Sequence, residues 1–322
     1  VSLADNIYKG YGDGVANEAG AVFTMTDGYI GVIHNDLVQD DTCRGVYNRG
    51  TFTMTGGEIF ASSDDMSSCY GLSNSSDYSA DGTETSSAVA TIGGNAVITG
   101  QCGYKPFAVN GTGTVNVGGN AVLTAKNVND CKDNRSRAIY LSRGTINVSG
   151  NPELISLHDF GSSNPPDTNG IRFEPSVTVN LSGGPVITAA THIQLEGTPS
   201  EPSTHFNIVG KLEKPVSPYV VVKRVDTDLS EGAFTNGWTE YMSDAEHDDY
   251  FTGPEGYGVL LYENELRLAE HAHKNIIYSA WEEIDSLPTT AGNYRLESDV
   301  TISETWNVPA GVTNLCLNGH KI

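Results

Sequence analysis

The chain has 322 residues, of which 40 are acidic and 18 are basic, so its formal net charge at pH 7 is −22. This charge excludes nucleic acids and anionic membrane surfaces as favourable partners, whereas a cationic partner or bound calcium would be compatible with it. Glycine is abundant at 36 residues and charged residues make up only 18% of the chain, a composition that suits a repetitive β-protein with a surface of Thr, Ser and Asn.

Six segments of the chain repeat one pattern. They are VFTMTDGYIG (22 to 31), TFTMTGGEIF (51 to 60), VATIGGNAVI (89 to 98), TVNVGGNAVL (114 to 123), TINVSGNPEL (145 to 154) and TVNLSGGPVI (178 to 187). Two apolar columns flank a column of Thr or Asn, which is the alternation of a strand with one buried face. The Gly- and Asn-rich columns that follow tolerate positive φ, so each copy is predicted to turn a tight corner there before a second short strand.

A third short strand is predicted upstream of most copies, at 45–48, 106–110, 138–141 and 170–173. Three strands in a repeat of variable length favour an all-β fold, a right-handed parallel β-helix (solenoid) of about six coils over residues 1–190, with strands stacked about 4.8 Å apart. Glu153 is the one carboxylate in an otherwise apolar column of the six copies. A local bulge is expected to turn its side chain outward.

The insertions of this solenoid are its predicted binding surface. They begin near residues 34, 62, 101, 126 and 158, at similar distances after each corner, so they are expected along one edge. Rigid repeats commonly present binding loops in this way. The candidate binding residues are Asp40, Asp41, Arg44, Asp64, Asp65, Tyr70, Tyr78, Tyr104, Arg135, Arg137, His158 and Phe160, with tyrosine and arginine as the expected anchors. The alternative is that these insertions are tolerated without a function.

The five cysteines, Cys43, Cys69, Cys102, Cys131 and Cys316, show no spacing typical of a metal site. The first four are expected in the loops. Cys43 and Cys69, like Cys102 and Cys131, are separated by close to one coil, so disulfides between neighbouring coils would be within reach. Buried free thiols are the alternative, and Cys316 has no assigned partner.

The pattern changes beyond residue 190. Strands are predicted at 191–197, 206–212, 219–225 and 257–269, and together they favour a β-strand capping subdomain over residues 191–270, because an open solenoid end exposes unpaired backbone. The acidic stretch 243–251 is expected to be a solvated loop, with a cation site as the alternative. Residues 271–322 are predicted to be a linker and the start of a further solenoid module, with Leu315 to Gly319 as a strand and corner.

Catalytic patterns are sparse in this sequence. Glycoside hydrolysis uses two carboxylates that flank the bond, and the adjacent pairs considered, Asp40–Asp41 and Asp64–Asp65, fall in predicted loops. The polar strand column offers Thr and Asn but no carboxylate. We therefore expect a non-enzymatic protein without a cofactor. A polysaccharide lyase or glycoside hydrolase of the same fold, or a passive surface stalk, is the alternative.

Two segments carry a family resemblance. GVYNRGTFTMTGGEI (45 to 59) and the segment from 292 to 322 resemble the multi-module, Gly/Asn/Thr-rich surface proteins of gut Gram-positive bacteria of the Clostridia type. The resemblance implies right-handed β-helix modules of the pectate-lyase-like superfold on the bacterial cell surface. It also implies an adhesin-like role toward a host protein, such as immunoglobulin or mucin, or toward a glycan. We expect the chain to be monomeric and, since it starts within a repeat, part of a longer polypeptide.

Overall fold

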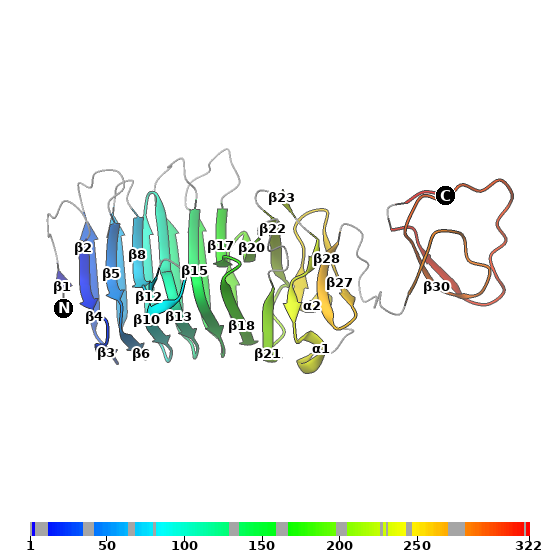
Figure 1. Cartoon of the computed structure of the whole chain (residues 1–322). Helices are drawn as coiled ribbons and strands as arrows, with labels where there is room; N and C mark the ends of the chain where they lie inside the picture. The colour runs from blue at the N-terminus through cyan, green and yellow to red at the C-terminus, as the bar shows by residue number, and fades with distance from the viewer. Residues whose placement is uncertain are drawn as a thin grey trace.

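The regular structure of the described residues is almost entirely β-strand, and most of these strands stack along one long axis (Figure 1). The computed structural model describes residues 2–3, 12–34, 42–63, 68–79, 82–128, 135–158, 167–197, 205–225, 228–229, 231–242, 247–269, 281–318 and 320–322. Long parallel sheets dominate these residues, an arrangement compatible with the expected β-solenoid. None of the described helices is long and apolar enough to cross a membrane.

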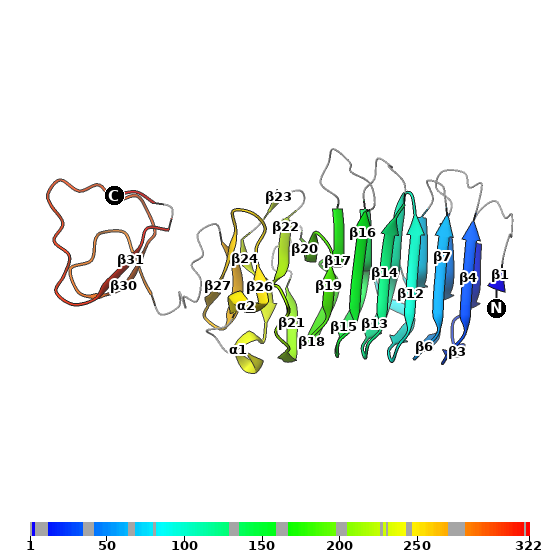
Figure 2. The same cartoon turned by 180° about the vertical axis from the view of Figure 1, so that it is seen from behind.

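The strands lie in three rows, which we number in the order in which the chain passes through them. Row one consists of β2 (Gly12–Asn17), β5 (Thr42–Asn48), β8 (Ser68–Asn74), the first half of β13 (Lys105–Val117), the first half of β15 (Arg135–Val148), β17 (Asp167–Phe173), β20 (Thr191–Gly197) and β22 (Tyr219–Val225). Row two consists of β3 (Val22–Met25), β6 (Thr51–Met54), β11 (Val89–Ile92), the second halves of β13 and β15, β18 (Val177–Gly183), β21 (Phe206–Leu212) and β25 (Thr235–Asn236). Row three, seen from behind in Figure 2, consists of β1 (Ser2–Leu3), β4 (Tyr29–His34), β7 (Glu58–Ser63), β12 (Val97–Cys102), β14 (Val122–Asn127), β16 (Glu153–His158) and β19 (Val186–Thr188).

The strand register of row two confirms the predicted alignment of the six repeats. The first residues of the six copies are successive partners in neighbouring parallel strands: Val22, Thr51, Val89, Thr114, Thr145 and Thr178. The apolar column beside them points inward, and Phe52, Val115 and Ile146 are completely buried there. The strand alternation read from the sequence therefore gives both the pairing and the buried face of this row.

The corner between rows two and three is one residue longer in the later repeats, which an alignment without gaps misses. Glu58 pairs with Val97 rather than Ala96, and Val122 pairs with Glu153. Glu153 therefore lies in the outward column with Glu58 and is exposed without any bulge. The expected bulge is wrong because the longer corner already turns this side chain outward. The inward column of row three is Ile30, Ile59, Ile98, Leu123, Leu154 and Ile187.

Glycines make the corners. Gly94, Gly119 and Gly150 have φ angles of 58°, 62° and 69°, in the left-handed region that L-residues with a Cβ disfavour. They also stack on one another, since a Cβ on Gly119 would lie 2.7 Å from the backbone nitrogen of Gly94. The asparagines of the next column were predicted to share this role, but the described non-glycine residues with positive φ are Glu263 and Asn318.

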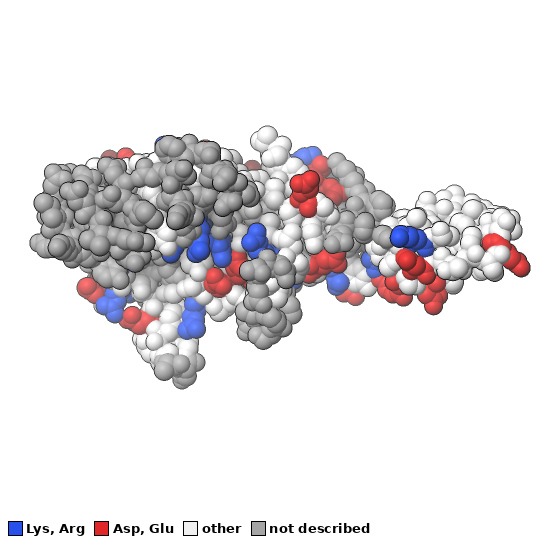
Figure 3. All heavy atoms as spheres, turned by 90° about the horizontal axis from the view of Figure 1, so that it is seen from above, with Lys and Arg blue, Asp and Glu red and all other residues white. Residues whose placement is uncertain are grey.

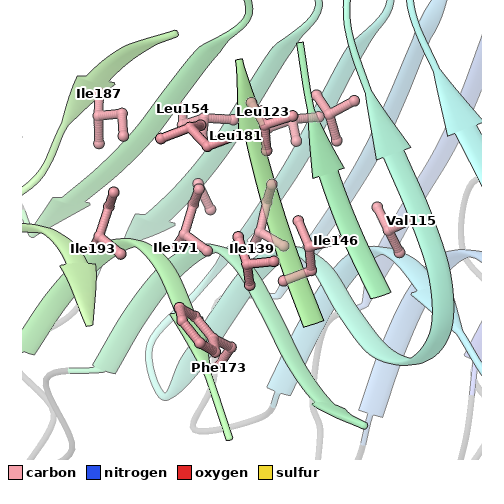
Figure 4. Packing of buried hydrophobic residues seen from close by; sticks show 14 of the residues in the cluster. Val115, Leu123, Ile139, Ile146, Leu154, Ile171, Phe173, Leu181, Ile187 and Ile193 are labelled. Carbon is pink, nitrogen blue, oxygen red and sulfur yellow. The ribbon is translucent and has the colours of Figure 1, made fainter. Parts of the chain in front are cut away.

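The core is a column of side chains enclosed by the three rows. Figure 4 shows Leu123, Leu154 and Ile187 of row three facing Ile139, Ile171 and Ile193 of row one. All of these six side chains are at most 9% exposed. Each repeat adds one layer to this column, so burial of apolar surface accumulates along the axis instead of in one central cluster.

Asparagine amides form two ladders along the strands. The buried ladder joins Asn17, Asn48 and Asn74, with Nδ2 to Oδ1 distances of 2.7 Å at both steps. The outer ladder joins Asn116, Asn147, Asn180, Asn207 and Asn236, with Nδ2 to Oδ1 distances of 2.7 to 3.0 Å. Each amide in such a ladder can donate to one neighbour and accept from the other, so stacked repeats satisfy its polar atoms.

Two of the five expected loops are corrected by the structure. The segment 62–86 contains a core strand, β8, whose residues pair with β5 and β13, followed by the antiparallel hairpin of β9 (Asp77–Tyr78) and β10 (Glu84–Ser86). The segment 101–106 belongs largely to β12 and β13, with residues 103 and 104 between them. The sequence pattern missed β8 because SCYGLSN lies within a Ser- and Asp-rich stretch that was read as one long insertion.

Parallel pairing continues past residue 190. β20 pairs with β17 and β22, and β21 pairs with β18 and β25, so rows one and two extend through the expected boundary of the cap. The predicted strands at 191–197, 206–212 and 219–225 are confirmed as β20, β21 and β22, and that at 257–269 is the hairpin of β27 (Gly258–Tyr262) and β28 (Glu265–Ala269). The remaining short elements are β23 (Asp228–Leu229), β24 (Gly232–Ala233), α1 (Trp238–Tyr241), α2 (His247–Tyr250) and β26 (Phe251–Thr252).

Large aromatic side chains fill the core at this end. Phe206, Phe234, Trp238 and Phe251 are each no more than 1% exposed, and neighbouring ring centroids lie 5.7 to 5.9 Å apart. The acidic stretch expected to be a solvated loop includes α2, whose His247 is fully buried. Aromatic packing thus replaces the aliphatic column where the parallel rows end, and the capping subdomain over residues 191–270 stays a prediction.

A small parallel sheet follows at the C-terminal end. β29 (Glu282–Ile284), β30 (Gly292–Leu296) and β31 (Thr313–Cys316) are paired in that order. The expected strand at Leu315 lies in β31, and Asn318 has a φ of 50° where the corner was predicted. Asn314 donates to Asn293 Oδ1 at 2.8 Å, which repeats the outer amide ladder in miniature. The prediction that a further module starts here stays a prediction.

Candidate binding groove

A groove with a volume of about 490 Å³ lies over row one. Its walls and floor combine cations, aromatic rings and small polar side chains. They comprise Arg44, Tyr47, Tyr70, Ser73, Asn74, Ser75, Lys105, Phe107, Asn110, Gly111, Thr112, Arg135, Arg137, Tyr140 and Ser142. This volume falls in the range of about 300–1,000 Å³ typical of small-ligand sites. We call this feature the row-one groove.

Strand register builds the row-one groove from four neighbouring repeats. Arg44, Tyr70, Phe107 and Arg137 are successive partners in β5, β8, β13 and β15 and therefore form one column. A second column, three residues further along the same strands, contains Tyr47, Ser73, Asn110 and Tyr140. Because parallel strands in register place equivalent residues side by side, both columns run along the axis of the molecule.

Aromatic rings form the floor of the groove. Tyr70 and Phe107 are stacked, with ring centroids 5.4 Å apart and an interplanar angle of 4°. Tyr140 follows with its centroid 5.8 Å from that of Phe107. The Arg137 guanidinium carbon lies 5.2 Å from the Phe107 centroid and 4.8 Å from the Tyr140 centroid. These contacts hold the arginine in a fixed position above the rings.

Charged contacts mark the two ends of the groove. At one end, Asp13 accepts from Arg44 Nε at 2.5 Å and from its Nη2 at 3.0 Å. At the other, Glu174 Oε1 accepts from the Tyr140 hydroxyl at 3.0 Å. Burial, reinforced by the Glu174 carboxylate, raises the pKa of Tyr140 to about 12. Burial also raises the pKa of Tyr70. The hydroxyls of Tyr70 and Tyr140 are therefore both protonated at neutral pH, and that of Tyr140 donates a hydrogen bond to Glu174.

The structure brings four of the predicted binding residues into this groove. Arg44, Tyr70, Arg135 and Arg137 all line it. Tyr104 lies beside it, with Lys105 Nζ 4.3 Å from its ring centroid. Tyr78, in the β9–β10 hairpin, packs instead under Arg143, whose guanidinium carbon is 4.6 Å from the ring centroid.

His158 is not part of the groove. It ends β16 in row three, in register with Asn127, and so belongs to a different row from the groove strands. The other predicted residues, Asp40, Asp41, Asp64, Asp65 and Phe160, lie outside the described residues. The expected loop edge therefore remains a prediction for these five positions.

Sequence reasoning missed several members of the groove: Tyr47, Lys105, Phe107, Asn110 and Tyr140. A signal for them was available in the third strand of each repeat. Aligning GVYN with AIYL places Tyr47 and Tyr140 in one column, as the register shows through Ser73 and Asn110. The missing strand β8 interrupted this column, so the continuity from Arg44 to Arg137 could not be seen.

Three cysteines point into the core, Cys43 and Cys69 from row one and Cys102 from the end of β12 in row three. Cys43 and Cys69 are register partners, and they form a buried apolar cluster with Cys102, Val32 and Ala61. All three are free thiols in strands rather than loop disulfides, and Cys316 is also free and buried. The expected disulfide between Cys43 and Cys69 is therefore not formed, and Cys131, the expected partner of Cys102, lies outside the described residues. Burial raises the pKa of the Cys69 thiol, which disfavours its reactive thiolate form.

A second cavity, with a volume of about 340 Å³, lies between β19 and residues 213–219. His192 and Tyr219 line it, with ring centroids 5.9 Å apart. The Tyr219 hydroxyl donates to the Pro185 carbonyl oxygen at 2.5 Å, and His192 Nδ1 accepts from the Val220 backbone N–H at 2.9 Å. This arrangement requires a neutral imidazole.

We expect His192 to make the stability of the fold depend on pH, with a loss of stability in acid. Burial lowers the pKa of this histidine below its ordinary value of 6.5. A lowered folded-state pKa stabilises the protein above pH 6.5, and this contribution is lost as the pH falls through the folded-state value. We expect the urea midpoint to drop between pH 7.5 and pH 5 by more in the wild type than in His192→Asn, whose amide oxygen can still accept from Val220 but does not titrate. An equal drop in both proteins would contradict this role.

Comparisons with known proteins give no identification: no protein-family model, curated protein sequence or solved structure matches the chain. Among the described residues, no group of three or more His, Cys, Asp or Glu side chains has an arrangement that could hold a metal ion. The row-one groove, with its cations and stacked rings, is thus the candidate site that the geometry itself defines.

Proposed function

We propose that this chain is a right-handed parallel β-helix that serves as a non-catalytic binding module and holds a glycan, free or carried by a host protein such as mucin, in the row-one groove. One observation carries the proposal. Arg44, Tyr70, Arg135 and Arg137, chosen from sequence as binding residues, converge with Phe107 and Tyr140 in a single groove. The same proposal includes display of this module on a bacterial cell surface and a monomeric state.

The lining of the groove suits a sugar chain. Its stacked rings offer apolar surface, while Ser73 and Asn110 offer a hydroxyl and an amide group that can bind sugar hydroxyls. The columns run along the axis across four repeats, so side chains from adjacent strands follow one another at intervals of about 4.8 Å. Such a periodic surface favours an extended ligand over a compact one.

The chemistry of the lining favours binding over catalysis. Hydrolysis of a glycosidic bond requires an acid and a base or nucleophile, usually two carboxylates about 5–10 Å apart. No Asp or Glu is among the described residues that line the row-one groove. Asp13 and Glu174 at its ends are already bound to Arg44 and Tyr140. These contacts support a site that holds its ligand without transforming it.

The experiment is a glycan array, with mucin and immunoglobulin as additional probes, carried out with the wild type and two tyrosine variants. Tyr70→Ala removes a half-buried ring stacked in the groove and is expected to weaken glycan binding at least tenfold, because an aromatic anchor is lost. Tyr29→Ala is the matched control, since Tyr29 is 41% exposed on row three. It is expected to bind as the wild type does.

Three outcomes would overturn the proposal. Wild-type protein that binds no glycan on the array would remove the function. Equal loss in both tyrosine variants, or in neither, would move the site away from the groove. Groove-dependent binding of immunoglobulin after enzymatic removal of its glycans would make the partner a protein surface instead.

A further inference from the structure

We infer that the second cavity, beside β19, binds an aliphatic amine, that is, a short alkyl chain ending in an ammonium group. Two sources carry this chemistry, a free alkylamine and the lysine side chain of another protein. The inference goes beyond the proposed glycan-binding function, because the described residues lining this cavity are all different from those lining the row-one groove. Its volume of about 340 Å³ is near the lower end of the range for small-ligand sites and suits one side chain. We call it the β19 cavity.

Two acceptor oxygens lie close together in the wall of the β19 cavity. The point where a Cβ on Gly184 would stand is 3.0 Å from Glu213 Oε2 and 3.1 Å from Asn151 Oδ1. Both of these residues line the cavity. Among the described residues, neither oxygen has a hydrogen-bond or ion-pair partner. An ammonium group carries three donors and no acceptor, so it can bind both oxygens at once.

The Glu213 carboxylate supplies the charge that attracts the amine. The other charged side chain in the lining, Lys214, is already bound, since its Nζ lies 2.9 Å from Asp249 Oδ2. His192 is neutral, as its hydrogen bond to the backbone requires, and so does not repel a cation. Burial, and then the Glu213 carboxylate, raise the pKa of Tyr219, so the negative charge of Glu213 acts on its neighbours in the cavity.

Exposed apolar side chains provide a contact for the alkyl part of the ligand. Val186 is 52% exposed and Val216 is fully exposed, and both line the cavity. An alkyl chain laid against them removes apolar surface from water, which a metal ion cannot do. Calcium also takes about six to eight oxygen ligands, whereas Glu213 is the only carboxylate among the described lining residues. The β19 cavity therefore suits an organic cation better than a metal ion.

The acidic character of the chain favours the approach of a cation. Its net charge is −22. Seen from above, many of the Asp and Glu side chains lie toward the C-terminal end of the long axis (Figure 3). A field of this sign attracts every cation, so it raises the rate of encounter without distinguishing among ligands. The choice of an amine comes from the two oxygens and the apolar wall of the cavity.

The proposal is tested by titrating the whole chain with three probes in saturation-transfer NMR experiments. Nα-acetyl-lysine N-methylamide represents a lysine in a protein, pentylamine is the free alkylamine, and Nα-acetyl-norleucine N-methylamide is the match without an ammonium group. At least one amine is expected to bind about tenfold more tightly than the norleucine probe, because a hydrogen bond to a charged group is gained. Tighter binding of the lysine probe than of pentylamine would identify a protein as the source, and the reverse a free alkylamine.

Variants separate the β19 cavity from the overall charge. Glu213→Gln keeps the shape of the side chain and is expected to weaken amine binding about tenfold. Glu58→Gln is the matched control, because Glu58 is exposed on β7 and does not line the cavity. Asn151→Asp adds a second carboxylate and is expected to tighten amine binding by about threefold or more, a gain that a misfolded protein could not give. Equal affinity for the lysine and norleucine probes would overturn the proposal, as would equal losses in the Glu213 and Glu58 variants.

Discussion

Replacement of Asn48 by alanine is expected to lower the free energy of unfolding by about 4 kcal/mol, a value at the upper end of single-residue effects. Asn48 is completely buried at the centre of the inner amide ladder. Its Nδ2 donates to Asn74 Oδ1 at 2.7 Å and to the carbonyl oxygens of Gly50 and Val89, both at 3.1 Å. Its Oδ1 accepts from Asn17 Nδ2 at 2.7 Å and from the Gly50 backbone N–H at 3.2 Å.

The size of this effect follows from what the substitution leaves behind. Alanine removes one donor group and one acceptor, so polar atoms of the strands on both sides remain in a dry interior without these partners. Each buried polar group left unsatisfied costs about 1–3 kcal/mol. Thermal and urea unfolding followed by far-UV circular dichroism measure the loss. Asn236→Ala is the control, because Asn236 ends the outer ladder at the exposed surface through one bond of 3.0 Å, and its loss should cost less than about 1 kcal/mol. Equal destabilisation by both variants would contradict the special role of the buried ladder.

Much of the scaffold follows directly from sequence periodicity. The alternation around Thr53 and Asn116 specifies an inward and an outward face, and the register of row two reproduces that alignment residue by residue. The corner glycines could be predicted for the same reason. Only a residue without a Cβ adopts φ near 60° at low cost and also leaves room for the equivalent glycine of the next repeat. These features repeat in every layer and therefore leave a signal in a single sequence.

Features that differ from one layer to another left no such signal. The longer corner that carries Glu153 outward changes the chain by one residue, and an alternating pattern cannot distinguish that from a bulge. Strand β8 was read as loop because it lies within a Ser- and Asp-rich stretch, although its Tyr70 and Leu72 are in register with Arg44 and Val46 of β5. The groove was found only in part for the same reason: Phe107 lies on β13, the neighbour of the missed strand β8, and Tyr140 lies on β15, one strand further along.

The second large effect concerns a bend in row one directly beneath the groove. The register skips one residue in each strand, at Gly45, Gly71 and Ala108, where the chain turns between its two halves. A Cβ on Gly71 would lie 2.4 Å from Ile98 Cγ2 and 2.9 Å from the Ala108 carbonyl oxygen. Gly71→Ala is therefore expected to cost about 2–3 kcal/mol, since overpacking a well-packed core displaces side chains or backbone. Because Tyr70 precedes this bend and lines the row-one groove, the same change should also weaken glycan binding.

The residues across the core suggest how to relieve this clash. Cβ atoms on Gly45, Gly71 and Gly170 would each meet the Cγ2 of an isoleucine, Ile59, Ile98 and Ile187 respectively, within 2.4 Å. The two intervening repeats have alanine at this position, Ala108 and Ala138, and the residues in register with Ile98 are leucines, Leu123 and Leu154. Leucine carries no methyl branch on its Cβ, so it leaves room for an alanine opposite. We expect Gly71→Ala combined with Ile98→Leu to recover at least half of the stability lost by Gly71→Ala, with Ile98→Leu alone costing less than about 1.5 kcal/mol. Additive losses in urea unfolding would show that the backbone contact with Ala108, rather than the isoleucine methyl, requires glycine at this bend.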